Sequence, residues 1–101
     1  MQDPILRKIF LAFIHVHILH HASKEPIYGT WMMEEIRSHG YEISTGTLFP
    51  ILHNMKKNGL LEVEEVLVEG RIRKYYSITE SGVGTLNAAR GKIDEMSLEI
   101  K

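Results

Sequence analysis

Apolar residues recur along this chain at helical spacing in several segments, and the first of these is apolar on almost every side. It begins at Asp3-Pro4, an N-cap followed by a proline at the first helical position. Such a helix needs burial on nearly all sides, which a chain of 101 residues hardly provides, so the pattern favours a partner subunit. One face consists of Leu6, Ile9, Phe10, Phe13 and Val16, and the opposite face of Leu11, Ile14 and Ile18.

A second, shorter helix is predicted from about Tyr28 to Ser38. Met32 and Met33 belong to its inner face, and Gly40 is suited to end it. Residues 41–43 then form a brief extended link. These features indicate two helices joined by a turn, since another helical pattern follows directly.

The third helix ends at Asn58-Gly59. With Ser44 as its N-cap, Pro50 would lie well inside the helix and kink it, whereas Thr47 as N-cap places the proline in the first turn. Local physical chemistry therefore favours Thr47. The apolar stripe of this helix is Leu48, Ile51, Leu52 and Met55, and the side that points away from it holds Gly46, Pro50, His53 and Lys57.

Two strands, residues 60–68 and 72–78, are predicted next, because Val, Ile, Leu and Tyr dominate both. Glu69-Gly70-Arg71 is the expected turn between them. In the second strand Arg73, Tyr75 and Ser77 share one face, and Lys74, Tyr76 and Ile78 share the other. The pattern is typical of a two-stranded hairpin.

The last segment predicts a helix that starts with Thr79 as its N-cap. Its apolar positions alternate in steps of three and four over about two heptads, which indicates a seam for packing against another helix. Interior glycines at positions 84 and 91 each cost about 1 kcal/mol relative to alanine, so this helix needs a packing partner. The seam consists of Leu86, Ala89, Ile93, Met96 and Ile100.

Length and composition narrow the class of protein. The 101 residues indicate a single domain, with residues 1–80 and the helix of residues 81–101 as its two parts. The absence of cysteine excludes thiolate metal sites and cysteine nucleophiles. A net charge of -1 excludes a uniformly basic protein but leaves room for a local basic patch. The longest uncharged run, residues 9–23, is too short for a membrane span of about 20 residues, so we expect a cytoplasmic protein.

The order of three helices, hairpin and helix is the outline of a winged helix-turn-helix, mainly α with a small β-hairpin and a C-terminal dimerisation helix. The run Ser44-Thr45-Gly46-Thr47-Leu48-Phe49-Pro50-Ile51-Leu52-His53 resembles the S-x-G-T-L-Y-P-x-L-x motif of the PadR family of transcriptional regulators. Residues 69–82, EGRIRKYYSITESG, resemble the wing of that family. Phe49 departs from its usual tyrosine and Ile72 from its usual wing proline.

The resemblance implies a homodimeric, sequence-specific regulator of transcription, and repression is favoured over activation. The residues themselves support contact with double-stranded DNA: no acid lies between Ile43 and Leu61, and the wing tip carries three cations within four positions. The expected DNA-binding residues are Ser44, Thr45, Gly46, Thr47, Phe49, Pro50, His53, Lys57, Arg71, Arg73, Lys74 and Tyr75, and the expected dimer interface is Leu11, Ile14, Ile18, Leu86, Ala89, Ile93, Met96 and Ile100.

Several alternatives stay open. A winged-helix module that binds proteins and never contacts DNA would share the same fold. A small hydrophobic or aromatic effector could occupy the dimer interface, where methionines and the single Trp31 suit such a ligand. No catalytic constellation, cofactor motif or metal motif stands out, so an enzyme is not expected. The group His15, His17, His20 and His21 nevertheless has spacings that suit either a metal ion or a response to pH.

Overall fold

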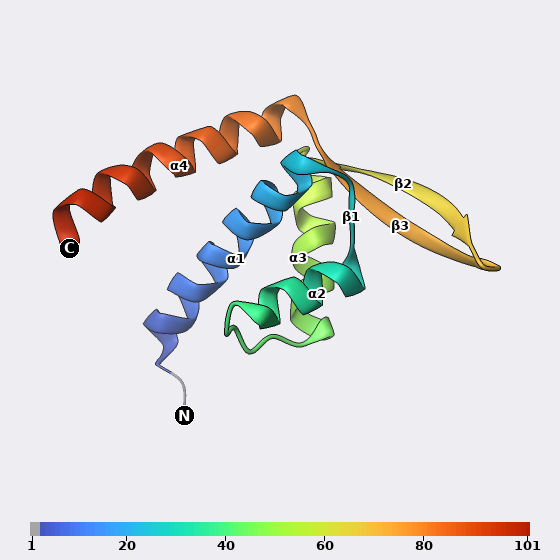
Figure 1. Ribbon diagram of the computed structural model, residues 1–101, viewed down its shortest axis with the longest axis horizontal. Helices are drawn as coiled ribbons and strands as arrows, with labels where there is room; N and C mark the ends of the chain where they lie inside the picture. Colours follow the sequence, from blue (N-terminus) through green and yellow to red (C-terminus); the bar gives the residue numbers. More distant parts are fainter. Residues whose placement is uncertain (1–2) are drawn as a thin grey trace.

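The chain forms a layer of helices with a long hairpin on one side and a projecting C-terminal helix on the other (Figure 1). The computed structural model describes residues 3–101. The helix-turn-helix is formed by α2, α3 and the link between them, and the hairpin of β2 and β3 is the wing, which confirms the predicted winged-helix fold. In chain order the elements are α1 (Pro4–Lys24), β1 (Ile27–Tyr28), α2 (Gly29–Ser38), α3 (Thr45–Lys57), β2 (Leu61–Val68), β3 (Arg71–Ile78) and α4 (Glu80–Ile100).

Two of the helices begin at the N-caps that the sequence predicts. Asp3 Oδ1 accepts hydrogen bonds from the backbone N–H groups of Ile5 at 2.8 Å and of Leu6 at 3.5 Å, with Pro4 in the first turn. Thr79 Oγ1 accepts from Gly82 N at 3.0 Å and donates to the carbonyl of Gly59. The second cap therefore joins the start of α4 to the turn that precedes β2.

The core lies where α1, α2 and α3 meet, and Ile27 of β1, Leu61 of β2 and Leu86 of α4 also belong to it. Its centre consists of side chains with almost no exposed surface, among them Ile18 of α1, Ile36 of α2 and Leu52 of α3. Arg37 donates from Nε and Nη2 to the carbonyl of Ile43, at 3.3 and 3.1 Å. These bonds fix the link between α2 and α3, so the helix-turn-helix has a defined geometry.

The sheet has three strands, one more than the sequence predicts. The strand order is β1-β3-β2, with Ile27 paired to Tyr76 and Tyr28 paired to Tyr75. The prediction missed β1 because two residues cannot show an alternating pattern. Since Gly29, the first residue of α2, directly follows β1, this short strand joins the helix-turn-helix to the wing.

The predicted start of the third helix is wrong. Ser44, not Thr47, is the N-cap of α3, and Pro50 lies inside the helix. The backbone N–H groups of Thr47 and Leu48 both bond to the carbonyl of Ser44, at 3.1 and 3.0 Å, which starts the helix one turn earlier than expected. Burial of Leu48 in the core outweighs the helical hydrogen bond that Pro50 cannot donate.

The two long helices carry exposed apolar residues outside the core. By length and composition alone α1 could cross a membrane, but core helices of soluble proteins often have the same length and composition. In this chain one side of α1 packs in the core and the other side is exposed. Large apolar side chains with at least two-fifths of their surface exposed are Ile5, Leu6, Ile9, Phe10 and Phe13 on α1, and Val83, Ile93, Met96, Leu98 and Ile100 on α4.

This burial corrects part of the expected dimer interface. Ile14, Ile18 and Leu86 are at most 2% exposed within the single chain, because they belong to its core, and they offer almost no surface to a partner. Leu11 is half-buried against the same core. Heptad spacing could not separate a seam inside one chain from a seam between two chains.

Candidate nucleic-acid interface

The outer side of α3 is exposed along its length. Most of the predicted DNA-binding residues of this helix are exposed, and Thr47 is half-buried. Ser44 Oγ donates to Thr47 Oγ1 at 3.3 Å, and no side chain caps the backbone N–H groups of the first turn. A helix N-terminus of this kind favours anionic groups such as phosphate. The exposed members are Ser44, Thr45, Gly46, Phe49, Pro50, His53 and Lys57.

The wing ends in a two-residue turn, one residue shorter than predicted. Glu69 and Gly70 both have positive φ, 49° and 80°, and Arg71 already pairs with Val68. Positive φ at both turn positions matches the twist of the flanking strands. Arg71 and Lys74 are exposed on the wing, where they can reach a neighbouring nucleic acid.

Arg73 is held in place by two tyrosines. Its guanidinium carbon lies 4.1 Å from the ring centre of Tyr28, and its Nη1 lies 3.4 Å from the hydroxyl of Tyr75. The two tyrosine rings also meet edge to face, with centres 5.5 Å apart. The hydrogen bond to Tyr75 raises the pKa of the Arg73 guanidinium. Sequence analysis did not place Tyr28 in this site, because Tyr28 itself lies on β1, the strand that was not predicted.

A groove runs between α3 and the wing. Phe49 packs over Gly29, where a Cβ would come within 2.5 Å of the Phe49 ring. The groove is lined by residues of three segments: Tyr28 and Gly29, Phe49 and Leu52, and the wing residues from Val68 to Lys74 that face it. The fold thus brings the predicted recognition helix and the predicted wing cations to one surface.

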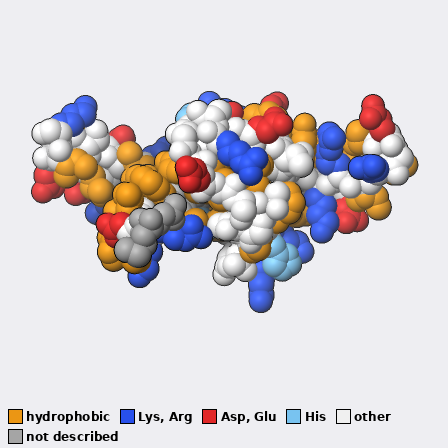
Figure 2. Space-filling model, turned by 90° about the horizontal axis from the view of Figure 1, so that it is seen from below, with side chains coloured by type: hydrophobic (Ala, Val, Ile, Leu, Met, Phe, Trp, Pro, Cys, Tyr) orange, Lys and Arg blue, Asp and Glu red, His pale blue; other side chains and the backbone are white. Residues whose placement is uncertain are grey.

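The charge on this surface is uneven. Figure 2, which views the molecule from below, shows Lys and Arg side chains over the wing, and hydrophobic side chains toward the N-terminal end of α1 and the far half of α4. Strand β2 adds acids beside the cations, since Glu65 pairs with Lys74 and Glu64 with Tyr75. The positive field is therefore local to the edge of the wing and to α3. Among the described residues, the histidines that cluster as potential metal ligands lie elsewhere, on α1 and just after α2.

Comparison with known proteins agrees with this arrangement. Residues 18–88, well over half of the chain, match the model of the PadR-like family of transcriptional regulators. The chain belongs to this family. The match spans α2, α3 and the wing, so the predicted resemblance is confirmed over the segments that carry the candidate site.

Individual relatives of this PadR-like protein support the same assignment. It is 38% identical over 95 residues to the transcriptional regulator Rv3488 of Mycobacterium tuberculosis, covering 94% of this chain and 89% of that protein. Among solved structures it resembles a PadR-like transcriptional regulator from Bacillus cereus, with 27% identity, a TM-score of 0.83 and 92% of each chain covered. The protein smu.1704 from Streptococcus mutans is 32% identical, with a TM-score of 0.78 over 84% of this chain and 79% of that one.

Proposed function

We propose that this PadR-like regulator binds double-stranded DNA as a homodimer in the cytoplasm and represses transcription from the promoters it covers. The observation that carries this proposal is the exposed, acid-free outer side of α3 lying beside the wing cations. An α-helix fits the major groove, and a wing contacts the flanking backbone. Residues 1–80 would bind DNA, and residues 81–101 would form the dimerisation helix.

Repression follows from the size of the protein. A small dimer that covers a promoter blocks access to it without needing a further surface for other proteins. Two α3 helices must meet two half-sites about 34–36 Å apart, or a multiple of this spacing. We therefore expect the preferred site to be a pseudo-palindrome.

The experiment that tests this function is the selection of bound sites from random duplex DNA by the full chain. We expect an enriched sequence with two inverted half-sites. Failure to enrich any sequence, with a folded and dimeric protein, would overturn the proposal and favour a winged-helix module that binds proteins instead.

Removing wing cations should weaken binding to all DNA sequences. We expect Arg71→Ala and Lys74→Ala each to lower affinity and to reduce the slope of log affinity against log salt by about one unit per lost phosphate contact. Arg73→Ala should do the same, and it also frees Tyr28 and Tyr75 from their shared partner. Salt titrations of operator and random duplex DNA measure both effects.

The matched control for these variants is Lys92→Ala, which removes one positive charge from α4, where Lys92 is exposed and 3.5 Å from Glu95. Its salt slope should equal that of the unaltered protein. Equal losses in Lys92→Ala and in the wing variants would mean that net charge alone matters. By contrast, changes at Thr47 or His53 should alter sequence preference more than the salt slope.

A small hydrophobic or aromatic effector would fit a second groove, between the N-terminal half of α1 and the link after α2. The lining of the groove combines apolar and aromatic residues with charged ones, Asp3, Arg7, Arg37 and Glu42. Phe10 and Tyr41 meet edge to face within it, with ring centres 5.6 Å apart. Trp31 does not line it, so its fluorescence cannot report on this site. Planar aromatic compounds should displace operator DNA, and Tyr41→Ala should remove their effect. The apolar lining is Leu6, Phe10, Leu11, Ile14, Tyr41 and Ile43.

A further inference from the structure

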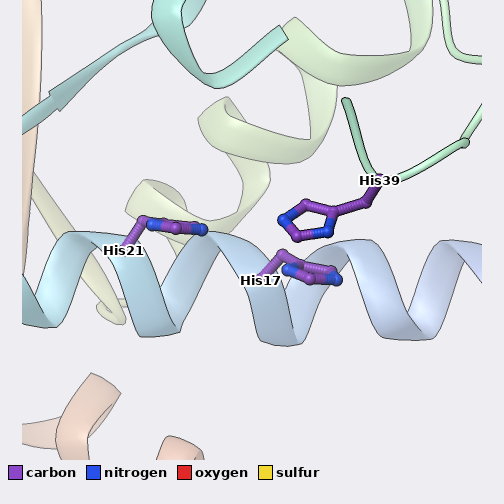
Figure 3. A group of neighbouring side chains, drawn as sticks. All are labelled: His17, His21 and His39. Atoms are coloured by element: carbon purple, nitrogen blue, oxygen red, sulfur yellow. The ribbon is translucent and has the colours of Figure 1, made fainter. Parts of the chain in front are cut away.

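Three histidines from two parts of the chain converge away from the candidate DNA interface. His17 and His21 lie one turn apart on α1, and His39 directly follows α2 (Figure 3). One nitrogen of each ring lies within 4.8 Å of the others. The rings of His17 and His39 stack, with centres 4.6 Å apart, and Figure 3 shows the two rings side by side.

A carboxylate completes the group. Glu35 Oε2 lies 3.3 Å from His21 Nε2 and 3.0 Å from His39 Nε2. In a tetrahedral zinc site, metal–ligand distances of about 2.0–2.2 Å place neighbouring ligand atoms about 3.4 Å apart. The separations of the Glu35 oxygen from the two imidazole nitrogens are thus close to those of adjacent ligands. His39 is exposed, so its ring can turn to close the remaining gap to His17.

Neutral imidazole is the form that ligates a metal ion. Imidazole ligands select zinc-like transition ions over Ca²⁺ and Mg²⁺, which require oxygen ligands.

We propose that His17, His21, His39 and Glu35 form a binding site for one divalent transition-metal ion of the zinc class in each chain. The ion would join the second half of α1 to the end of α2, two helices that already meet through apolar packing and through the contact of His21 with Glu35. The proposal stands on the side-chain geometry alone and does not depend on DNA binding.

The test uses Co²⁺ as a spectroscopic substitute, with the full chain prepared without a histidine tag and freed of metal by a chelator. We expect one Co²⁺ per chain with the visible absorption of a four-coordinate site, displaced by Zn²⁺. Trp31 provides a second signal, since its ring centre lies 5.4 Å from that of His21, and bound Co²⁺ should quench its fluorescence. Zn²⁺ at a hundredfold excess over its dissociation constant should raise Tm by about 10 °C.

Ligand variants decide the result. His17→Ala, His39→Ala and Glu35→Gln should each weaken Co²⁺ binding at least about tenfold, as loss of even supporting groups does at metal sites. His20→Ala is the matched control: it lies beside His21 on the same helix but contacts Arg90, at 3.1 Å, and should leave Co²⁺ affinity unchanged. Circular dichroism confirms that each variant is folded.

Three outcomes would overturn the proposal. The first is a folded protein that binds no Co²⁺ at 100-fold molar excess. The second is undiminished binding by a His17→Ala/His39→Ala double variant. The third is an equal loss in His20→Ala, which would indicate a diffuse histidine surface instead of a defined site.

Discussion

Replacing Gly82 with alanine should destabilise the protein by about 3 kcal/mol, the upper end of the usual range for overpacking. A Cβ at this position would overlap the carbonyl oxygen of Leu60 and lie 2.6 Å from Cγ1 of Ile78. The Leu60 carbonyl cannot move aside cheaply, because it accepts the hydrogen bond of Thr79 N at 3.1 Å. The loss exceeds the gain of about 1 kcal/mol that alanine brings to a helix.

Gly84→Ala is the control, since it makes the same substitution two residues later in the same helix. No atom lies within 4 Å of a Cβ at position 84. This variant should be more stable than the unaltered protein by about 0.5–1 kcal/mol. Urea unfolding at one fixed protein concentration measures both free energies of unfolding. Similar values for the two variants would show that the contact between α4 and Leu60 is looser than described.

Placing charges on the exposed seam of α4 should separate the proposed dimer. Ile93 and Met96 are 41% and 49% exposed in the single chain, and they follow one another on the predicted seam. The double variant Ile93→Asp/Met96→Asp would bury unpaired carboxylates between two chains, which costs several kcal/mol. We expect the dimer dissociation constant to rise at least about a hundredfold, which corresponds to 2.7 kcal/mol. Operator affinity should fall with it, since a monomer meets only one half-site.

Leu98→Asp provides the comparison within the same helix. Leu98 is 84% exposed, more than Ile93 or Met96. It lies five positions after Ile93 and therefore on nearly the opposite side of α4. Sedimentation equilibrium should find this variant as dimeric as the unaltered protein. We expect the dimer interface to bury well over 1,200 Å² in total, since about 1,200 Å² is the lower bound for stable complexes. Dissociation by Leu98→Asp, or a dimeric double variant, would place the interface elsewhere.

The order of elements was predictable because each has a local signal. Asp3-Pro4 and Thr79 start helices through side-chain caps, and Val, Ile, Leu and Tyr are frequent in the wing strands. Strand β1 was not predictable, because its two residues are extended only through pairing with β3. The start of α3 was predicted wrongly for a related reason. The preference of Pro50 for the first turn of a helix is a local effect, whereas the burial of Leu48 depends on the whole fold.

The sequence predicted which segments form the candidate interface, but not the contacts between individual side chains within it. The acid-free α3 and the cations of the wing lie on one surface, as the sequence suggested. The stacking of Arg73 on Tyr28 was missed because the two residues are 45 positions apart and meet only across the sheet. In the same way, the histidine pattern of α1 gave no indication of His39 or Glu35, which α2 brings to it.

The shape of α4 has a mechanical consequence. Its 21 residues make a rigid rod about 32 Å long, yet the residues it buries within the chain, Gly82 and Leu86, lie in its first two turns. Beyond Arg90, which contacts His20 of α1, the helix projects from the body (Figure 1). Rotation by about 10° at the anchored end would swing the far end through roughly 5 Å for a rod of this length. In the proposed dimer a rearrangement of less than about 1 Å near Thr79 would thus be amplified along α4 into a much larger displacement. This displacement would change the separation of the two DNA-binding surfaces, so that they no longer match the spacing of two half-sites on the double helix.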